Sequence, residues 1–500
     1  MTSLDTPLPD DVSAARPDRL VLKLVIAIAL ASLADFLFYG ERIGLSLVIF
    51  AIAVIGGSLL ANIGGWRQGH ARLAAVIIVA GVAPAVEELN TVSFLFVVLA
   101  LGIGLSALTN PNFGRLADQL RALRDLYLIG PFRFFSDTAS LLNVSAFTAG
   151  IVVWLVPLVL GFIFVLLFAS ANPLIEHWIS LINAERATSN IDVVQSLYWL
   201  IMLLVVWPFI HIRWRQRKPP VNPNAAAAVT ADSEAAVDDV PNFFSEATIL
   251  RSLVLFNVLF AIQTILDLIY LWGQATLPAG VTYAAYAHQG SYPLILTALL
   301  AAGFVLAAVK AGEPTERSRL IRPLVYLWIA QNVMLVASAI QRLHLYVEIY
   351  MLTYWRVAAF IWMLLVVIGL VLIVARMMLE RSNGWLVRMN LISLGIILYI
   401  CALVNFAAII GDYNVSHSKE AGGNGVDIDI YYLSSLGPHA LPALDKAIAL
   451  RKDNDSNLVY RRNLLVDIQR QDMASWRSWG FRSWRLQRYL DNLSKQSDAG

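Results

Sequence analysis

Eleven strongly apolar stretches, separated by polar loops, dominate the pattern of this 500-residue chain. A helix needs about 20 apolar residues to cross the roughly 30 Å hydrocarbon core of a bilayer, where every backbone polar group must be hydrogen-bonded. The pattern therefore predicts an all-α polytopic membrane protein with about 11 transmembrane helices. The expected spans are residues 20–39, 45–62, 73–86, 92–108, 147–168, 197–212, 253–272, 294–309, 324–340, 357–375 and 391–410.

Lys and Arg residues concentrate in every second loop. The N-terminal tail and the loops on its side hold 19 of them, whereas the opposite short loops hold only Arg42, Arg186, Arg342 and Arg356. The positive-inside rule then predicts a cytoplasmic N-terminus and, with eleven crossings, an extracytoplasmic C-terminus. The same count supports the weak span at 73–86, because without it the early basic loops would face away from the later ones.

Composition along the chain divides it into a membrane part and a tail. A small, mostly helical extracytoplasmic C-terminal domain is expected from helical patterning at 440–450, 458–468 and 476–493. The expected divisions are an N-terminal tail at 1–19, six spans at 20–212, a cytoplasmic linker at 213–245, five spans at 246–411 and the C-terminal domain at 412–500.

A segment at 113–135 repeats apolar residues at helical spacing, with Arg115, Arg121 and Arg124 among them. This pattern predicts an amphipathic helix that lies on the inner leaflet, and a solvated loop is the alternative.

The composition narrows the functional classes. With 58% hydrophobic and 14% charged residues, the chain lies outside the soluble globular range, so its main partner is the lipid bilayer. A net charge of +2 gives no reason to expect nucleic acid. Cys401 is the single cysteine, which excludes an intramolecular disulfide and a cysteine-based zinc cluster.

Two carboxylates stand out inside the spans, Asp35 and Asp267. A charged side chain at bilayer depth costs about 2.5–3.5 kcal/mol on insertion scales, so such residues often mark function. Both aspartates precede an aromatic stretch that ends in glycine, which indicates a faint internal repeat of the first and seventh spans. A helix-packing or snorkelling role is favoured over proton transfer for each.

The extracytoplasmic face is expected to hold most of the other reactive side chains. A metal site built from His288, His344 and Glu348 was weighed against scattered interfacial residues, and the latter is favoured because no two histidines have ligand spacing. We therefore predict no catalytic, cofactor-binding or metal-binding residue. The candidate functional positions are Asp35, Asp267, Tyr283, Tyr286, His288, Arg342, Glu348 and Arg356.

Several segments of the sequence, including some of these candidate positions, resemble a known family. They are residues 35–44, Asn172-Pro173, Asp267 with 283–290, Arg342 to Arg356, Asn405, Asn414, Tyr432-Leu433 and 442–444. Together they resemble an uncharacterised bacterial multi-pass membrane family, known only as a domain of unknown function. The resemblance implies a protein of the bacterial cytoplasmic membrane and brings no catalytic residues. Three positions depart from it: Met351 replaces an expected glycine, Phe406 an expected proline, and His439 lies in a region expected to be acidic.

Three functional classes remain, in this order. A scaffold or sensor-accessory protein of the cell envelope needs no catalytic group, and it would bind an envelope protein or lipid on the extracytoplasmic side. A secondary transporter would need polar or broken helices near the bilayer midplane, of which the spans offer few. A lipid-linked envelope enzyme would need a larger first outer loop than residues 40–44 provide. An enzyme therefore ranks last of the three classes.

The last part of the tail alternates tryptophan and arginine between Trp476 and Arg488. Such a stretch is typical of segments that dock on anionic lipid headgroups. Packing against the other tail helices is an equal alternative.

Overall fold

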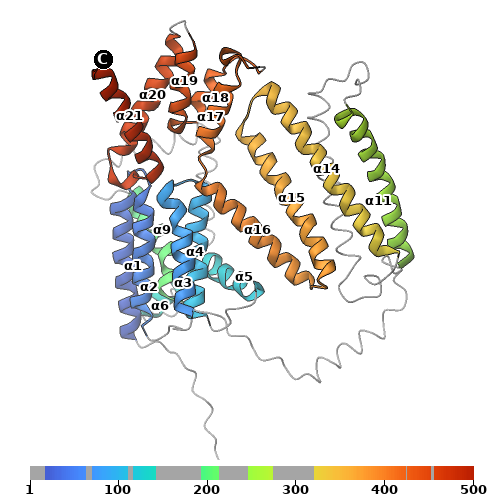
Figure 1. Cartoon of the computed structure of the whole chain (residues 1–500). Helices are drawn as coiled ribbons and strands as arrows, with labels where there is room; N and C mark the ends of the chain where they lie inside the picture. The colour runs from blue at the N-terminus through green and yellow to red at the C-terminus, as the bar shows by residue number, and fades with distance from the viewer. Residues whose placement is uncertain are drawn as a thin grey trace, which may run out of the picture. The chain divides into compact units, whose positions relative to one another are not determined.

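The computed structural model describes residues 17–63, 70–110, 116–141, 193–212, 246–273, 320–423, 425–451 and 455–499 (Figure 1). Every regular element in these ranges is a helix, and they contain no strand. The all-α prediction is confirmed for this part of the chain. The expected spans at 147–168 and 294–309 lie outside the described residues.

In the part of the chain that the structure describes, six helices are long and apolar enough to cross a membrane, so the chain is a membrane protein. The expected number of eleven spans stays a prediction. Two shorter apolar helices, α2 (Leu45–Ala61) and α9 (Val193–Ile210), accompany the six. The six are α1 (Pro17–Phe38), α4 (Thr91–Thr109), α11 (Glu246–Asp267), α14 (Ile321–Tyr350), α15 (Tyr354–Met378) and α16 (Asn383–Leu403).

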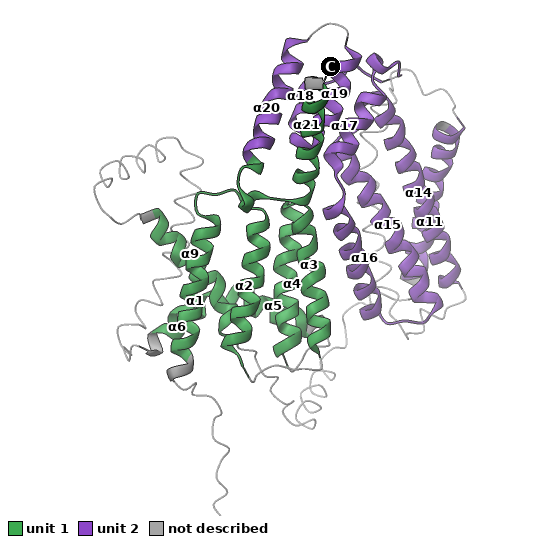
Figure 2. Ribbon diagram, turned by 60° about the vertical axis from the view of Figure 1, so that its left-hand side comes forward, with its two compact units in different colours: residues 1–216, 472–500 green, residues 217–471 purple. Residues whose placement is uncertain are grey.

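The chain forms two compact units, shown in different colours in Figure 2. Unit 1 combines Met1–Gln216 with Asp472–Gly500, and unit 2 is Arg217–Gln471. Each unit is described by itself below. The domain boundaries expected from the sequence stay predictions.

Unit 1 packs α1, α2, α3 (Ala71–Glu87), α4 and α9 around a core of leucine, valine and alanine. The weak third span is a helix that contains Pro84 and lies very close to α4, because Gly81 allows this approach. A Cβ atom at Gly81 would overlap the Cβ of Ala100. The remaining elements are α5 (Leu116–Arg124), a π-helical turn η2 (Asp125–Ile129), α6 (Gly130–Leu141), a 3₁₀ turn η6 (Trp476–Ser478) and α21 (Phe481–Ala499).

The segment expected to be amphipathic is helical and continuous from α5 through η2 to α6. It packs against α4 and α9, and the ring of Phe134 meets the buried Trp207 edge-on at 5.3 Å. Its expected place on the inner leaflet stays a prediction.

Unit 2 begins with α11 and the π-helical turn η3 (Leu268–Trp272), followed by α14, α15 and α16. A core that includes Leu253, Trp328 and Leu370 joins these helices. The tail of the unit contains α17 (Phe406–Ser416), η4 (Lys419–Ala421), α18 (Ile430–Ser435), η5 (Pro438–Ala440), α19 (Leu441–Leu450) and α20 (Ser456–Met473).

Two helices of unit 2 end at other residues than the expected spans. The helix that contains the expected ninth span, 324–340, continues to Tyr350, so Arg342 and Glu348 lie on α14 and not in a loop. The helix at the expected last span, 391–410, ends at Leu403, and the side chain of Asn405 accepts a hydrogen bond from the amide of Ala408 (3.1 Å). This cap begins α17 as a separate helix.

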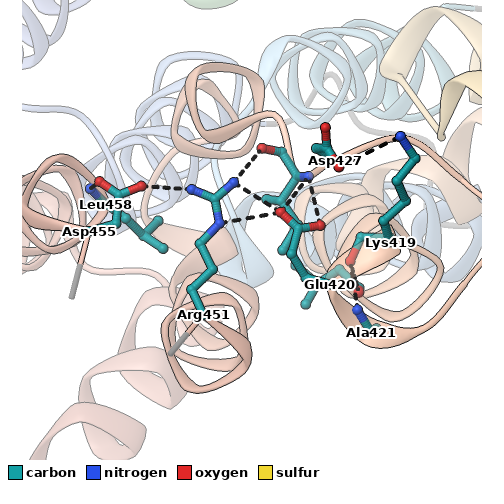
Figure 3. A network of polar contacts seen from close by, with 10 residues as sticks. Lys419, Glu420, Ala421, Asp427, Arg451, Asp455 and Leu458 are labelled. Carbon is teal, nitrogen blue, oxygen red and sulfur yellow. Dashed lines mark hydrogen bonds and ion pairs between the residues drawn. The ribbon is translucent and has the colours of Figure 1, made fainter. Parts of the chain in front are cut away.

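An ion-pair network holds the tail of unit 2 together (Figure 3). Arg451 donates to Glu420 (2.9 Å) and to Asp455 (2.7 Å), and both oxygens of Glu420 accept from the amide of Ile428 (3.1 Å each). Burial opposes ionisation of Glu420, but these hydrogen bonds and the charge of Arg451 lower its pKa overall. The hydrogen bonds to Glu420 and Asp455, together with the charges of these two carboxylates, raise the pKa of Arg451.

Candidate functional site

Asp267 and Arg342, both singled out from the sequence, meet in the interior of unit 2. Asp267 is the last residue of α11 and 1% exposed, while Arg342 lies on α14 and is 5% exposed. Nη2 of Arg342 donates to Oδ1 of Asp267, and the side chain of Gln263 donates to the same oxygen (2.9 Å). Arg342 was expected in a loop, because a hydropathy pattern takes an arginine as the end of a span. Its carboxylate partner instead allows it to lie buried on α14.

The backbone changes geometry immediately after Asp267. The π-helical turn η3 carries the chain to Trp272, whose indole N–H donates to Ser338 Oγ on α14 (3.3 Å). Single π-helical turns are rare and often occur at functional sites. Here the turn adds a second polar contact between the same two helices, one helical turn from Arg342.

A line of buried amides continues along the α11–α14 contact. Asn257 donates to the carbonyls of Leu253 (2.8 Å) and Leu324 (3.0 Å), and Gln331 donates to the carbonyl of Asn257 (3.1 Å). Asn332 donates to the carbonyl of Trp328 (2.7 Å). These contacts fix the amide orientations, because a flipped amide would set two oxygens together.

The side-chain oxygens of Asn257, Gln331 and Asn332 are buried and have no hydrogen-bond partner among the described residues. We call these three residues the amide seam. A buried acceptor without a hydrogen bond lowers the folding stability by about 1–3 kcal/mol, so we expect each oxygen to bind a donor such as water.

The contacts of Asp267 and the amide seam also give the direction of the helices. Asn257 contacts the start of α14 and Asp267 contacts a later part, so α11 and α14 run parallel.

Asp35, the other candidate aspartate, lies in unit 1 and has a different partner. It is half-buried near the end of α1, and the amide of Gln195 on α9 donates to both its oxygens (3.2 and 3.1 Å). Tyr198 on α9 donates to the carbonyl of Ala34 (2.9 Å). Lys23 at the other end of α1 contacts His211, so α1 and α9 run antiparallel. The similarity between the two aspartate segments therefore does not extend to the helices that pack on them.

Arg356 and Glu348 lie near the turn that joins α14 to α15, but in different contacts. Nη1 of Arg356 donates to the carbonyls of Tyr350 (2.5 Å) and Met351, and its guanidinium lies 4.5 Å from the ring centre of Tyr346. Glu348 pairs with His344 one turn earlier on α14 (3.2 Å), and both side chains are exposed. Arg356 thus holds the turn, whereas Glu348 faces outward.

The same turn is fastened to the tail of unit 2. The amide and carbonyl of Leu352 pair with the side chain of Asn414 on α17 (2.7 and 2.9 Å), and the amide of Tyr354 donates to Tyr432 (3.0 Å). Met351 has a φ of 66°, a conformation that favours glycine, which explains why glycine was expected there. Phe406 is the first residue of α17, where proline is favoured.

Three candidate residues, Tyr283, Tyr286 and His288, lie outside the described residues. The weighed metal set of His288, His344 and Glu348 is therefore not tested. Within the described part of the chain, no group of three histidine, cysteine or acidic side chains could hold a metal ion.

Unit 1 also contains a cluster of carboxylates that the sequence pattern did not predict. Arg482 pairs with Glu87 (3.3 Å) and Glu88 at the α3–α4 turn, Arg485 also pairs with Glu87, and Arg477 pairs with Glu41 (2.5 Å). We call residues 472–488 the C-terminal strap. Its Trp479 carbonyl accepts from the amide of Leu45 (2.8 Å), so the strap is hydrogen-bonded to the start of α2 as well.

The structure adds a contact that neither interpretation of the tryptophan and arginine stretch included. Arg477, Arg482 and Arg485 face carboxylates near the ends of α1 and α3, and docking of the stretch on lipid headgroups stays a prediction. The only sequence signal was charge complementarity with Glu41, Glu87 and Glu88 across about 400 residues of chain. Such a separation gives no local pattern.

Residues 74–447, about three quarters of the chain, match the sequence model of a family described as a domain of unknown function, DUF4153. This match confirms the resemblance seen in the sequence. No curated protein and no solved structure matches the chain.

Proposed function

The chain belongs to the DUF4153 family, a domain of unknown function, and from this premise we propose that it is a scaffold or sensor-accessory protein of a bacterial cell envelope. In this proposal it has no enzyme activity. It presents the C-terminal strap and the tail as a binding platform for an envelope protein or lipid.

The proposal includes a topology of eleven crossings in the cytoplasmic membrane, with the N-terminus in the cytoplasm and a small helical C-terminal domain outside. Two helix directions support it. The first and sixth crossings must run in opposite directions, as α1 and α9 do, and the seventh and ninth must run in the same direction, as α11 and α14 do. The ends of α1 and α3 that hold the C-terminal strap would both be extracytoplasmic, on the same side as the C-terminus.

The observation that carries the scaffold proposal is that the carboxylates described above bind other side chains of the same chain. Asp267 binds Arg342, Asp35 binds Gln195, and Glu41, Glu87 and Glu88 bind the C-terminal strap. These contacts stabilise the fold. Such a structural role of charged groups is expected of a protein that presents a fixed binding surface. Aromatic side chains remain exposed on the C-terminal strap, including Trp476 (49%) and Phe481 (39%).

Site-specific photocrosslinking in the native host tests this proposal. A photoreactive amino acid at Trp476 should give a discrete adduct with another envelope component, because an exposed aromatic beside paired arginines is an accessible contact surface. The same probe at Val387, an exposed apolar position on α16, is the matched control and should give lipid adducts alone. Adducts at Trp476 and Phe481 that match those at Val387, with neither a protein adduct nor enrichment of one lipid class, would contradict the scaffold proposal.

A secondary transporter is the second candidate, and the amide seam favours it. Buried acceptors without protein donors are typical of positions where water or a small solute enters a helix bundle. In proteoliposomes, the purified chain should then carry a measurable proton or cation flux that Asn332→Leu removes. Asn390→Leu on α16 is the control, since Asn390 makes the same contact with its own helix (2.9 Å to Leu386 O). No flux above empty liposomes would exclude this candidate.

A further inference from the structure

A second buried polar cluster lies in unit 1, at the opposite end of α1 from Asp35. Lys23 of α1, Asn62 at the end of α2, Asp137 of α6, and Trp207 and His211 at the end of α9 converge there. Asp137 is 4% exposed and His211 is 6% exposed. We call these five residues the His211 cluster.

Hydrogen bonds in the His211 cluster determine the state of the imidazole ring. Nζ of Lys23 lies 3.4 Å from Nδ1 of His211 and 3.3 Å from Oδ1 of Asn62. A lysine ammonium has hydrogen atoms to donate and no acceptor, so Nδ1 must carry a lone pair. A neutral ring that meets this requirement carries its proton on Nε2, the nitrogen that faces Oδ2 of Asp137 at 3.8 Å, beyond hydrogen-bond distance.

The neighbours of the His211 ring have opposite effects on its charge. Asp137 favours a charged ring and is fixed by the indole N–H of Trp207 (3.0 Å), whose ring stacks on His211 with centres 5.5 Å apart. Lys23 opposes a charged ring, because two cations would meet at 3.4 Å. The charge of the ring therefore decides which of the two contacts, with Asp137 or with Lys23, is favourable.

Other charged groups also face this region. Asp125 of η2 and Arg133 of α6 line a small pocket that reaches His211, together with Gly130 and Pro208. Asp125 is itself paired with Arg124 (2.7 Å), so its charge is partly balanced. The pocket therefore places charged side chains of η2 and α6 on the same lining as His211.

We propose that the His211 cluster is a proton-binding site that couples pH to the packing of α1 against α9. A proton from water binds Nδ1 of His211 and turns this acceptor into a donor. The contact with Lys23 is then lost, while the charged ring is drawn toward Asp137. Acidification therefore releases α1 from α9 at this end and leaves the Asp35 contact with Gln195 at the other end in place.

Nuclear magnetic resonance of the full chain, with isotope-labelled histidine in lipid nanodiscs, tests this inference directly. The chain has seven histidines, and the signal missing in His211→Gln assigns the ring. We expect an Nε2-protonated neutral ring at high pH and a titration between about pH 5 and 8. Lys23→Met should move the midpoint upward by about one pH unit, a tenfold gain in proton affinity, and Asp137→Asn should move it downward.

The control is His344→Gln, which removes an exposed histidine of unit 2 and should leave the His211 titration unchanged. A purely structural role for Lys23 would not shift the midpoint of a neighbouring ring in this direction. The proposal is overturned if His211 keeps one charge state between pH 5 and 8. It is equally overturned if Nδ1 carries the proton of the neutral ring, or if Lys23→Met leaves the midpoint in place.

Discussion

The two aspartates in the candidate membrane spans are held in contrasting ways. Asp267 is 1% exposed and binds an arginine, whereas Asp35 is half-buried and binds the neutral amide of Gln195. A carboxylate that is fully removed from water needs a charge to compensate it, while a partly solvated one needs a hydrogen-bond donor alone. Similar sequence surroundings therefore do not imply the same role, because burial decides what partner the carboxylate needs.

The largest effect should come from breaking the buried pair. Arg342→Met leaves Asp267 without its cation and should destabilise unit 2 by about 3–5 kcal/mol, because an uncompensated buried charge is strongly unfavourable. Thermal or denaturant unfolding of the purified chain in detergent measures this change. Asp267→Asn combined with Arg342→Met should recover much of the loss, since both charges are then absent. A double variant no more stable than Arg342→Met would contradict the assigned pairing.

The C-terminal strap offers an intermediate case. Arg482 is 5% exposed, but its partners Glu87 and Glu88 are more open to solvent. Arg482→Gln should cost about 2 kcal/mol, because two adjacent carboxylates lose their shared cation. Limited proteolysis of the chain end should become faster as the C-terminal strap detaches. Arg488→Gln is the control, since Arg488 contacts the ring of Trp484; equal proteolysis of both variants would contradict the prediction.

The Glu420–Arg451 pair, which lies outside the candidate spans, should show its contribution through pH. The pKa of Glu420 is lowered in the folded protein, so the pair stabilises the fold above the ordinary glutamate pKa. This stabilisation disappears as pH falls through the lowered folded pKa. Glu420→Gln should cost about 1–2 kcal/mol at neutral pH and flatten the acid side of the stability profile. An unchanged acid profile in this variant would show that Glu420 does not contribute.

The smallest effect is expected at Asp35. Asp35→Asn keeps a side chain of the same size that still accepts from Gln195, so the change in stability should be below about 1 kcal/mol. The unfolding measurement used for Arg342→Met serves here too. A loss comparable to that of Arg342→Met would mean that Asp35 has a charged partner and that the two aspartates are alike.

The helices could be predicted because a long apolar run in the sequence indicates a membrane-spanning helix without information on distant residues. Asp35 and Asp267 were also found, since a lone carboxylate in such a run is conspicuous. Arg342 was expected in a loop and lies on α14, because hydropathy carries no information on its pairing with Asp267, 75 residues away. Glu87 and Glu88 were overlooked for the same reason: they look like an ordinary solvated turn until Arg482 is placed beside them.

The length of α14 has a mechanical consequence. Thirty residues at 1.5 Å each form a rod of about 45 Å, longer than the hydrocarbon core of a bilayer. The backbone of Leu352, two residues beyond the end of α14, is hydrogen-bonded to both polar atoms of the Asn414 side chain. The tail is therefore attached directly to the end of α14. A tilt of the tail in unit 2 would thus move the end of α14 and, through this helix, the contact between Arg342 and Asp267.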